Sequence, residues 1–172
     1  AWANLNGGLI YNVGVKASNK PVTILTGAKI TDNDISTITN GSDNTSFNGG
    51  LIYAAGMLTL DNVLISGNES TSTNNGSGNV SVTGGLIYYR NNEQFHTYRD
   101  AVFSLNNAEI SGNTVTIRKT TLAGNTSFSG SLIYIGSNWD SGNRTEFTDL
   151  AFTGNESYIY SESYGTAGAS AT

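Results

Sequence analysis

The chain has no cysteine, one proline, Pro21, and one histidine, His96, among its 172 residues. Without cysteine it can form neither a disulfide, a thiolate zinc site nor a thiol redox centre. One histidine cannot build a histidine-rich metal site, so we expect His96 to be a loop residue. The chain also lacks any apolar run near the ~18 residues that a membrane-spanning helix requires, so we expect no membrane insertion.

Charge is scarce as well. Charged residues make up 12% of the chain, only eight of them are Lys or Arg, and the net charge is −5. The basic footprint of a nucleic-acid-binding protein is therefore absent, and we predict no nucleic-acid partner. The chain begins at Ala1 rather than Met, which indicates either removal of a signal peptide or a fragment of a longer chain. Removal of a signal peptide, which we prefer, would place the protein outside the cell or at its surface.

Glycine, asparagine, serine and threonine are abundant instead. The 21 glycines, together with a hydrophobic content of 37% and an aromatic content of 10%, indicate a chain that can form a core. No segment shows the 3.6-residue apolar period of an amphipathic helix. The composition is typical of short strands joined by tight turns.

One pentapeptide recurs along the chain. Gly-Gly-Leu-Ile-Tyr begins at Gly7, Gly49 and Gly84, and Gly-Ser-Leu-Ile-Tyr begins at Gly130, at spacings of 42, 35 and 46 residues. Each copy is followed by a short alternating segment and then by a motif that ends in asparagine, at residues 30–33, 65–68, 110–113 and 152–155. A unit this small cannot bury an apolar face alone, so successive repeats must stack on one another.

The repeats predict a single all-β domain over residues 1–172, a right-handed parallel β-helix (β-solenoid) built from about four imperfect repeats. Their approximate bounds are 7–48, 49–83, 84–129 and 130–164, with 165–172 as a C-terminal tail. We expect three or four strands per repeat, each ~4.8 Å from its counterpart in the next repeat. A polar loop should end each repeat, and segments such as 70–78 and 90–100 should project sideways.

Stacked repeats place equivalent residues on one another. The expected ladders are Leu9, Leu51, Leu86 and Leu132; Tyr11, Tyr53, Tyr88 and Tyr134; and Asn33, Asn68, Asn113 and Asn155, the last joined by side-chain amide hydrogen bonds. Leu, Ile and Tyr are consecutive, and side chains alternate along a strand, so either Ile or the Leu–Tyr pair should face outward. The outer apolar row would be covered by this chain itself or by another chain.

The two motifs together, Gly-Gly-x-Ile and a four-residue motif ending in Asn, resemble the repeat of the chlamydial polymorphic outer-membrane proteins. The resemblance extends from Gly7 to about Asn155. It departs from that family in having Leu after the glycine pair, Ser131 in the fourth copy, and an aromatic start to the Asn motif only at Phe152. The resemblance implies exported parallel β-helix domains, which in that family are often adhesive.

Carboxylates that could carry chemistry are few. Asp32 and Asp34 are the best local pair for glycoside hydrolysis, and with Asp43 they could hold calcium. Acidic residues recur at the same place after the Asn of other repeats, at Glu69 and Glu156, as solvated turn residues would. We therefore favour a structural interpretation and predict no enzyme activity, no metal site and no cofactor.

Several Asn-x-Ser/Thr sequons are present, and those expected in loops are Asn44, Asn75, Asn79 and Asn143. These four would be the glycosylation sites if the organism modifies asparagine.

The preferred functional interpretation is an extracellular structural protein, a homopolymer-forming subunit of a filament, sheath or matrix. Open solenoid ends template further strand pairing, so we expect assembly through Trp2, Tyr158, Tyr160 and Tyr164 near the two ends. The alternative is an adhesin passenger domain that binds a host surface or glycan through lateral loops.

Overall fold

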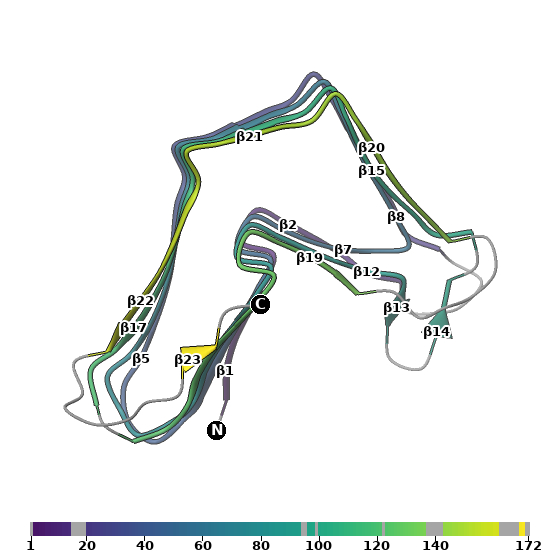
Figure 1. The fold of residues 1–172 in the computed structure, drawn as a ribbon. Coiled ribbons are helices and arrows are strands. Elements are labelled where there is room, and N and C mark those ends of the chain that lie inside the picture. The colour runs from purple at the N-terminus through teal and green to yellow at the C-terminus, as the bar shows by residue number, and fades with distance from the viewer. Residues whose placement is uncertain are drawn as a thin grey trace.

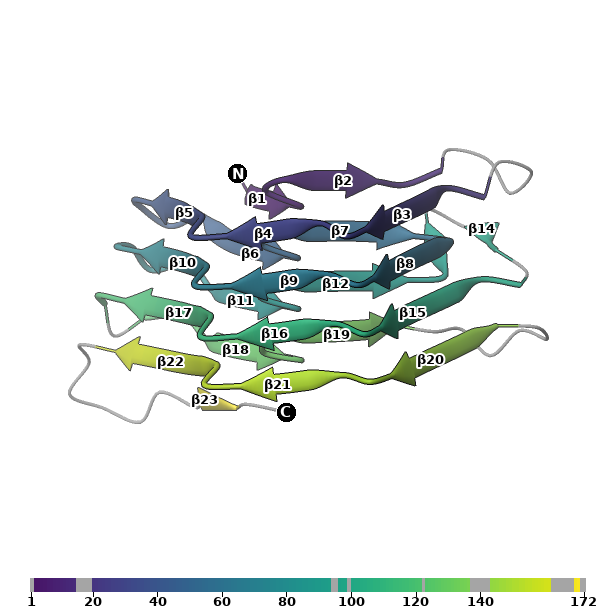
Figure 2. The ribbon, with the colours of Figure 1, turned by 90° about the horizontal axis from the view of Figure 1, so that it is seen from above.

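The computed structural model describes residues 2–14, 20–93, 96–98, 100–121, 123–136, 143–161 and 169–170. Their regular structure consists of strands wound into a parallel β-solenoid of four coils (Figures 1 and 2). Figure 1 looks along the axis from the C-terminal end, and the chain advances toward the viewer in a counter-clockwise sense, so the solenoid is right-handed. None of the described residues forms a helix long and apolar enough to cross a membrane.

Each of the four coils contributes one strand to each of five parallel sheets, which we name A to E in chain order, and β23 adds a fifth strand to sheet A. Sheet A contains β1 (Trp2–Asn6), β6 (Asn44–Asn48), β11 (Val80–Thr83), β18 (Thr126–Ser129) and β23 (Ala169–Ser170). Sheet B contains β2 (Ile10–Asn12), β7 (Ile52–Ala55), β12 (Ile87–Arg90) and β19 (Ile133–Gly136). Sheet C contains β3 (Val22–Thr26), β8 (Met57–Asp61), β15 (Val102–Asn106) and β20 (Arg144–Thr148).

The remaining two sheets complete the coil. Sheet D contains β4 (Lys29–Thr31), β9 (Leu64–Ser66), β16 (Glu109–Ser111) and β21 (Ala151–Thr153). Sheet E contains β5 (Asp34–Thr39), β10 (Glu69–Asn74), β17 (Thr114–Lys119) and β22 (Glu156–Ser161). Between sheets B and C, the third coil carries an antiparallel pair, β13 (Asn92–Glu93) and β14 (His96–Thr97), which projects from the side of the stack.

Equivalent residues pair across neighbouring coils. Ile52 lies opposite Ile10 on one side and Ile87 on the other. The inward-facing rows form one continuous core, whose fully buried members include Phe47, Leu58, Leu60, Ile65, Phe103, Leu105 and Ile110. The fold prediction of an all-β parallel solenoid of about four repeats is confirmed, with one coil per repeat.

The glycine pair forms the corner between sheets A and B. Gly49 has φ of 57°, and a Cβ at this position would lie 2.1 Å from the carbonyl oxygen of Ile52. A Cβ on Gly50 would lie 2.3 Å from the carbonyl oxygen of Gly85 in the next coil. Both glycines are therefore required by close backbone approach, and the first also by its left-handed conformation.

The polar loop predicted after each asparagine is wrong, because sheet E occupies that place. Residues 70–74, expected to project sideways, belong to β10. Ser70 and Ser72 face inward and are buried between Ile35 of β5 and Val115 and Ile117 of β17. The Ser/Thr run has no apolar alternation of its own, and its strand conformation comes from the neighbouring coils. The tail expected at 165–172 also contains a strand, since Ala169 pairs with Thr126.

Candidate functional site

The asparagine ladder lies at the corner between sheets D and E. From each coil to the next, the Nδ2 of one asparagine donates to the Oδ1 of the following one over 2.8 Å, in the order Asn33, Asn68, Asn113 and Asn155. Each of these Oδ1 atoms also accepts the backbone N–H of the preceding asparagine over 3.1 Å. Asn68 and Asn113 are fully buried. The ladder is thus a directional chain of amide hydrogen bonds along the solenoid axis.

The tyrosine ladder lies on the outer face of sheet B. Ring centroids of successive members, Tyr11, Tyr53, Tyr88 and Tyr134, are 5.1, 4.6 and 5.1 Å apart. The Arg90 guanidinium lies 5.9 Å from the ring centroids of both Tyr53 and Tyr88. Tyr53 is only 6% exposed, whereas Tyr11 in the first coil is 53% exposed. Stacking and the arginine therefore cover the ring faces in the middle coils.

The leucine ladder corrects the expectation that Leu and Ile face opposite ways. Leu51 and Ile52 are both fully buried. The N–H groups of both residues donate to the same carbonyl oxygen, that of Leu86, over 2.9 Å. The chain turns at the leucine, just before β7 begins, so strand alternation does not apply between these two residues. In the middle coils no apolar leucine row is left on the outside.

The rows that are buried in the middle coils are open at the two end coils. Phe147 and Phe152 of the last coil are 52% and 44% exposed, although the core residues paired with them, Leu105 and Ile110, are fully buried. At the other end, Leu9 is 49% exposed. The ends therefore present core side chains together with the free edges of β-strands.

Two of the four residues expected in assembly lie on the outer face of β22. Tyr158 and Tyr160 have ring centroids 5.7 Å apart, and the Arg118 guanidinium lies 4.9 Å from the Tyr160 ring centroid. The Tyr158 hydroxyl donates to Glu156, and this hydrogen bond raises the pKa of Tyr158. Trp2 belongs to β1, but its side chain, like the whole of Tyr164, lies outside the described residues.

The three aspartates considered for calcium do not all lie together along the chain path. Asp32 is at the corner between sheets D and E, and the six-residue strand β5 separates it from Asp43. Within the part of the chain that the structure describes, no group of three or more His, Cys, Asp or Glu residues could hold a metal ion. His96 lies in β14 rather than in a loop.

The four predicted glycosylation residues lie at the edges and turns of the stack. Asn75 and Asn79 are exposed, and the Oδ1 of Asn44 accepts the backbone N–H of Asn79 over 2.8 Å. Asn75 Nδ2 donates to Asn40 Oδ1 over 2.9 Å. These side chains therefore form ladders of their own.

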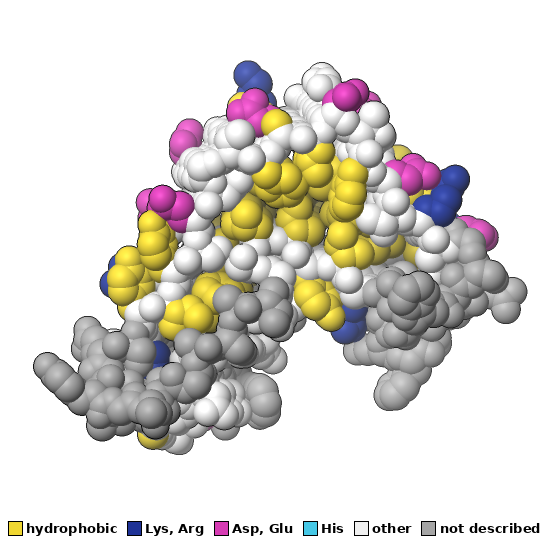
Figure 3. Space-filling view, viewed as in Figure 1, with side chains coloured by type: hydrophobic (Ala, Val, Ile, Leu, Met, Phe, Trp, Pro, Cys, Tyr) yellow, Lys and Arg dark blue, Asp and Glu magenta, His cyan; other side chains and the backbone are white. Residues whose placement is uncertain are grey.

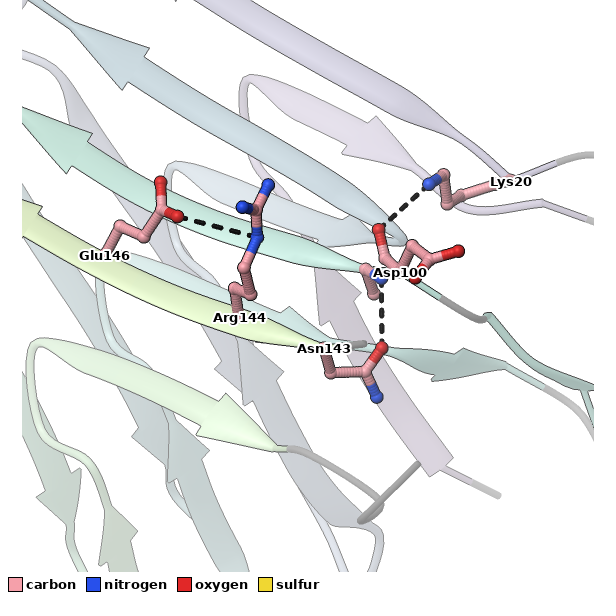
Figure 4. Close-up of polar contacts among 6 residues, drawn as sticks. Lys20, Asp100, Asn143, Arg144 and Glu146 are labelled. Atoms are coloured by element: carbon pink, nitrogen blue, oxygen red, sulfur yellow. Dashed lines mark hydrogen bonds and ion pairs between the residues drawn. The ribbon is translucent and has the colours of Figure 1, made fainter. Parts of the chain in front are cut away.

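The fourth glycosylation candidate, Asn143, ties the last two coils together. Its Oδ1 accepts the backbone N–H of Ala101 over 2.9 Å, close to where Lys20 Nζ donates to the Asp100 carbonyl oxygen over 2.9 Å (Figure 4). On the adjoining strand, Arg144 and Glu146 form an exposed ion pair at 3.5 Å. The first two contacts link residues that shortly precede the strands of sheet C in different coils, whereas the ion pair lies within β20.

Sequence analysis did not predict the role of Lys119, which ends β17. Its side chain is 2% exposed, and its Nζ donates to Asn74 Oδ1 over 3.2 Å, to the Gly78 carbonyl oxygen over 2.6 Å and to the Gly76 carbonyl oxygen. Burial lowers the pKa of Lys119, and the three oxygen acceptors oppose that shift. The Lys119 ammonium thus lies among three oxygen atoms of the preceding coil, namely one side-chain amide oxygen and two backbone carbonyl oxygens. A lysine in a polar repeat gives no signal of this role.

Comparison with known proteins adds no family: no protein-family model, curated protein or solved structure matches the chain. The class that the fold defines is a parallel β-solenoid repeat protein. The resemblance to the chlamydial repeat stays a prediction.

Proposed function

We propose that the chain is a structural protein of an extracellular filament, sheath or matrix, in which copies stack end to end. The observation that carries the proposal is the likeness of the two end coils. In sheets C, D and E the edge strands of the first and last coils have equal lengths, five, three and six residues. The last coil of one copy can therefore stand beneath the first coil of the next, as consecutive coils do within the chain.

The apolar rows of the solenoid continue across such a junction. Continuing the observed registers places Phe147 beside Leu25, Phe152 beside Ile30, and Tyr160 beside Ile38 of the next copy. Tyr160 and Ile38 are 47% and 66% exposed in the single chain. Their burial supplies a hydrophobic driving force, which is not weakened by salt.

The asparagine ladder gives the junction a direction. Within the chain, the amide of each coil donates toward the next coil. Asn155 Nδ2 would then donate to the Oδ1 of Asn33 in the next copy. If two C-terminal ends were placed together, the Nδ2 donors of two Asn155 side chains would face each other with no acceptor between them. The contact is therefore heterologous and head to tail, which builds a filament when the rotation does not close.

Two features oppose the junction and make it testable. Glu156 would lie beside Asp34 of the next copy, and like charges repel. In sheet A, β23 occupies part of the edge of β18 that the next copy's β1 would need. Added salt and truncation after Ser161 should therefore both strengthen assembly.

Electron microscopy and sedimentation of the purified chain over a concentration series test the proposal. We expect unbranched polymers that persist at high salt. Phe152→Lys should give monomers, because it places a charge in the open core row. Thr153→Lys adds the same charge to the neighbouring position on the outer face and should still polymerise.

Monomers at every concentration, with or without residues 162–172, would contradict end-to-end stacking. That outcome would favour the alternative, an adhesin that binds through segment 90–100, where β13 and β14 project from the stack (Figure 1).

A further inference from the structure

The outer faces of sheets A and B meet at the glycine corner, which points into the molecule, and so form the two walls of an open furrow. Figure 1 shows the two sheets diverging from this corner, and Figure 3, in the same end-on view, shows the surface hollowed between them. In β7 the core residues are Ile52 and Ala54, so Tyr53 faces the furrow. In β6 the core residue is Phe47, so Ser46 and Asn48 face it from the other wall.

The chemistry of the furrow is polar and nearly uncharged. The wall from sheet A carries hydroxyl and amide side chains, Asn4, Asn6, Ser46, Asn48, Ser81, Thr83, Ser127 and Ser129. The opposite wall carries the tyrosine ladder and one guanidinium, that of Arg90. Asn48 Nδ2 donates to Asn6 Oδ1 over 2.9 Å and to Ser46 Oγ over 3.1 Å, so this wall is an ordered array of hydrogen-bonding groups.

The furrow also has a regular spacing along the axis. The same groups return once per coil, and the tyrosine centroids mark a repeat of 4.6 to 5.1 Å. Tyr53 is only 6% exposed, and the ring faces of successive tyrosines stack on one another, so a ligand meets the edges and hydroxyls of Tyr11, Tyr88 and Tyr134 rather than ring faces. A ligand that fits is a linear polymer with polar, uncharged groups and a repeat close to one strand spacing.

We propose that this furrow binds a neutral, extended polysaccharide whose axis runs along the solenoid, with one sugar residue per coil. Pyranose units in an extended β-linked chain repeat at close to the strand spacing, and their hydroxyls both donate and accept hydrogen bonds, as the Ser, Thr, Asn and Tyr side chains of the furrow do. The proposal places carbohydrate binding on the solenoid body, not on its lateral loops, and it does not depend on end-to-end assembly.

Two other classes of polymer fit less well. A nucleic acid or other polyanion needs a row of cations, and the described part of the furrow offers the single guanidinium of Arg90 in a chain of net charge −5. A peptide needs apolar pockets or a free strand edge, but the furrow walls are sheet faces whose backbone groups are paired along the axis.

Titration calorimetry with β-1,4-linked hexasaccharides of glucose and of N-acetylglucosamine tests the proposal on the full chain. Maltohexaose, an α-linked glucose hexamer that coils, is the control for shape, and a heparin hexasaccharide is the control for charge. We expect saturable binding of at least one β-linked hexamer and much weaker binding of both controls.

Two matched variants locate the binding. Ser81→Val combined with Tyr88→Phe removes two furrow hydroxyls, keeps the ring stack and retains strand-forming residues. Thr73→Val removes a hydroxyl from the outer face of β10, away from the furrow. We expect the furrow variant to bind about thirtyfold more weakly, since it loses two hydrogen bonds that each contribute on the order of 1 kcal/mol, and Thr73→Val to bind as wild type.

Failure of every β-linked hexamer to bind would overturn the proposal, as would equal loss in Thr73→Val or binding of maltohexaose or heparin as tight as that of the β-linked hexamers. Circular dichroism of each variant, compared with wild type, excludes loss of fold as the cause of weaker binding. Because the furrow lies on the flank of every chain and not at its ends, carbohydrate binding can fail while end-to-end assembly stands, and the reverse.

Discussion

A single asparagine in this solenoid serves three partners at once. Asn113 receives two hydrogen bonds at its Oδ1 from Asn68, and its Nδ2 donates to Asn155 and, over 2.9 Å, to the carbonyl oxygen of Ile65. It therefore links the corners of three successive coils through side-chain and backbone groups alike. At full burial no water can replace these bonds.

We expect Asn113→Ala to lower the free energy of unfolding by about 3 kcal/mol or more, because several buried donors and acceptors lose their partner together. Urea denaturation followed by circular dichroism measures the change. Asn40→Ala is the matched control: its Oδ1 accepts one exposed bond from Asn75, and its loss should cost less than about 1 kcal/mol. Equal costs for the two variants would show that the buried ladder adds nothing beyond a surface ladder.

The corners are the elements that set the shape of each coil. Gly49 and Gly112 both have positive φ, 57° and 61°. They differ in their surroundings, since a Cβ on Gly49 would meet a carbonyl oxygen at 2.1 Å and a Cβ on Gly112 would meet nothing within 4 Å. Substituting each of these two glycines in turn therefore separates the free-energy cost of a left-handed conformation from the cost of close backbone approach.

We therefore predict that Gly112→Ala lowers the free energy of unfolding by about 1–2 kcal/mol, the cost of a left-handed alanine. Gly49→Ala should cost more than about 4 kcal/mol, since the corner between sheets A and B must also move. Thermal and urea unfolding of the two variants measure the difference. Similar stabilities would mean that the corner at Gly49 can shift without disturbing the ladders.

How far the sequence predicts the elements depends on where the periodic signal lies. Exact repetition of Gly-Gly-Leu-Ile-Tyr predicts stacking, and alternation in residues 57–60 and 102–105 predicts strands of sheet C. Sheet E gives no such signal in the second coil, where Ser70 and Ser72 occupy inward positions. The apolar partners that bury them, Ile35 and Val115, come from other coils and cannot be read locally.

The site residues divide in the same way. The tyrosine and asparagine stacks follow from the repeat, because equivalent positions must coincide. The furrow between sheets A and B cannot be predicted from the repeat, since it depends on the direction in which the chain turns at the glycine corner. The role of Lys119 is equally hard to predict from the sequence, because two of its three acceptors are backbone carbonyl oxygens of another coil.

At the scale of the whole molecule, stability is the sum of coils and of contacts between neighbouring coils. The second and third coils have partners on both sides, while residues 144–149 and 151–154 of the last coil are exposed or nearly so. Amide hydrogen exchange should therefore be slowest in β7, β8, β12 and β15 and fastest in β20, β21 and β22. Uniform exchange rates would indicate one all-or-none unit, and slowing of β20–β22 on polymerisation would mark the junction.

The hydrogen bonds between coils all run along the axis, while the covalent chain runs across it. A tensile force along the axis is therefore borne by five sheets side by side, so that all strands of a layer must yield together. A force applied sideways to one strand end meets its bonds one at a time and peels the coil away. The same fold thus resists a tensile force along its axis strongly and a force that unwinds it from one end weakly. The force needed to disrupt it depends on the direction of pulling rather than on thermodynamic stability.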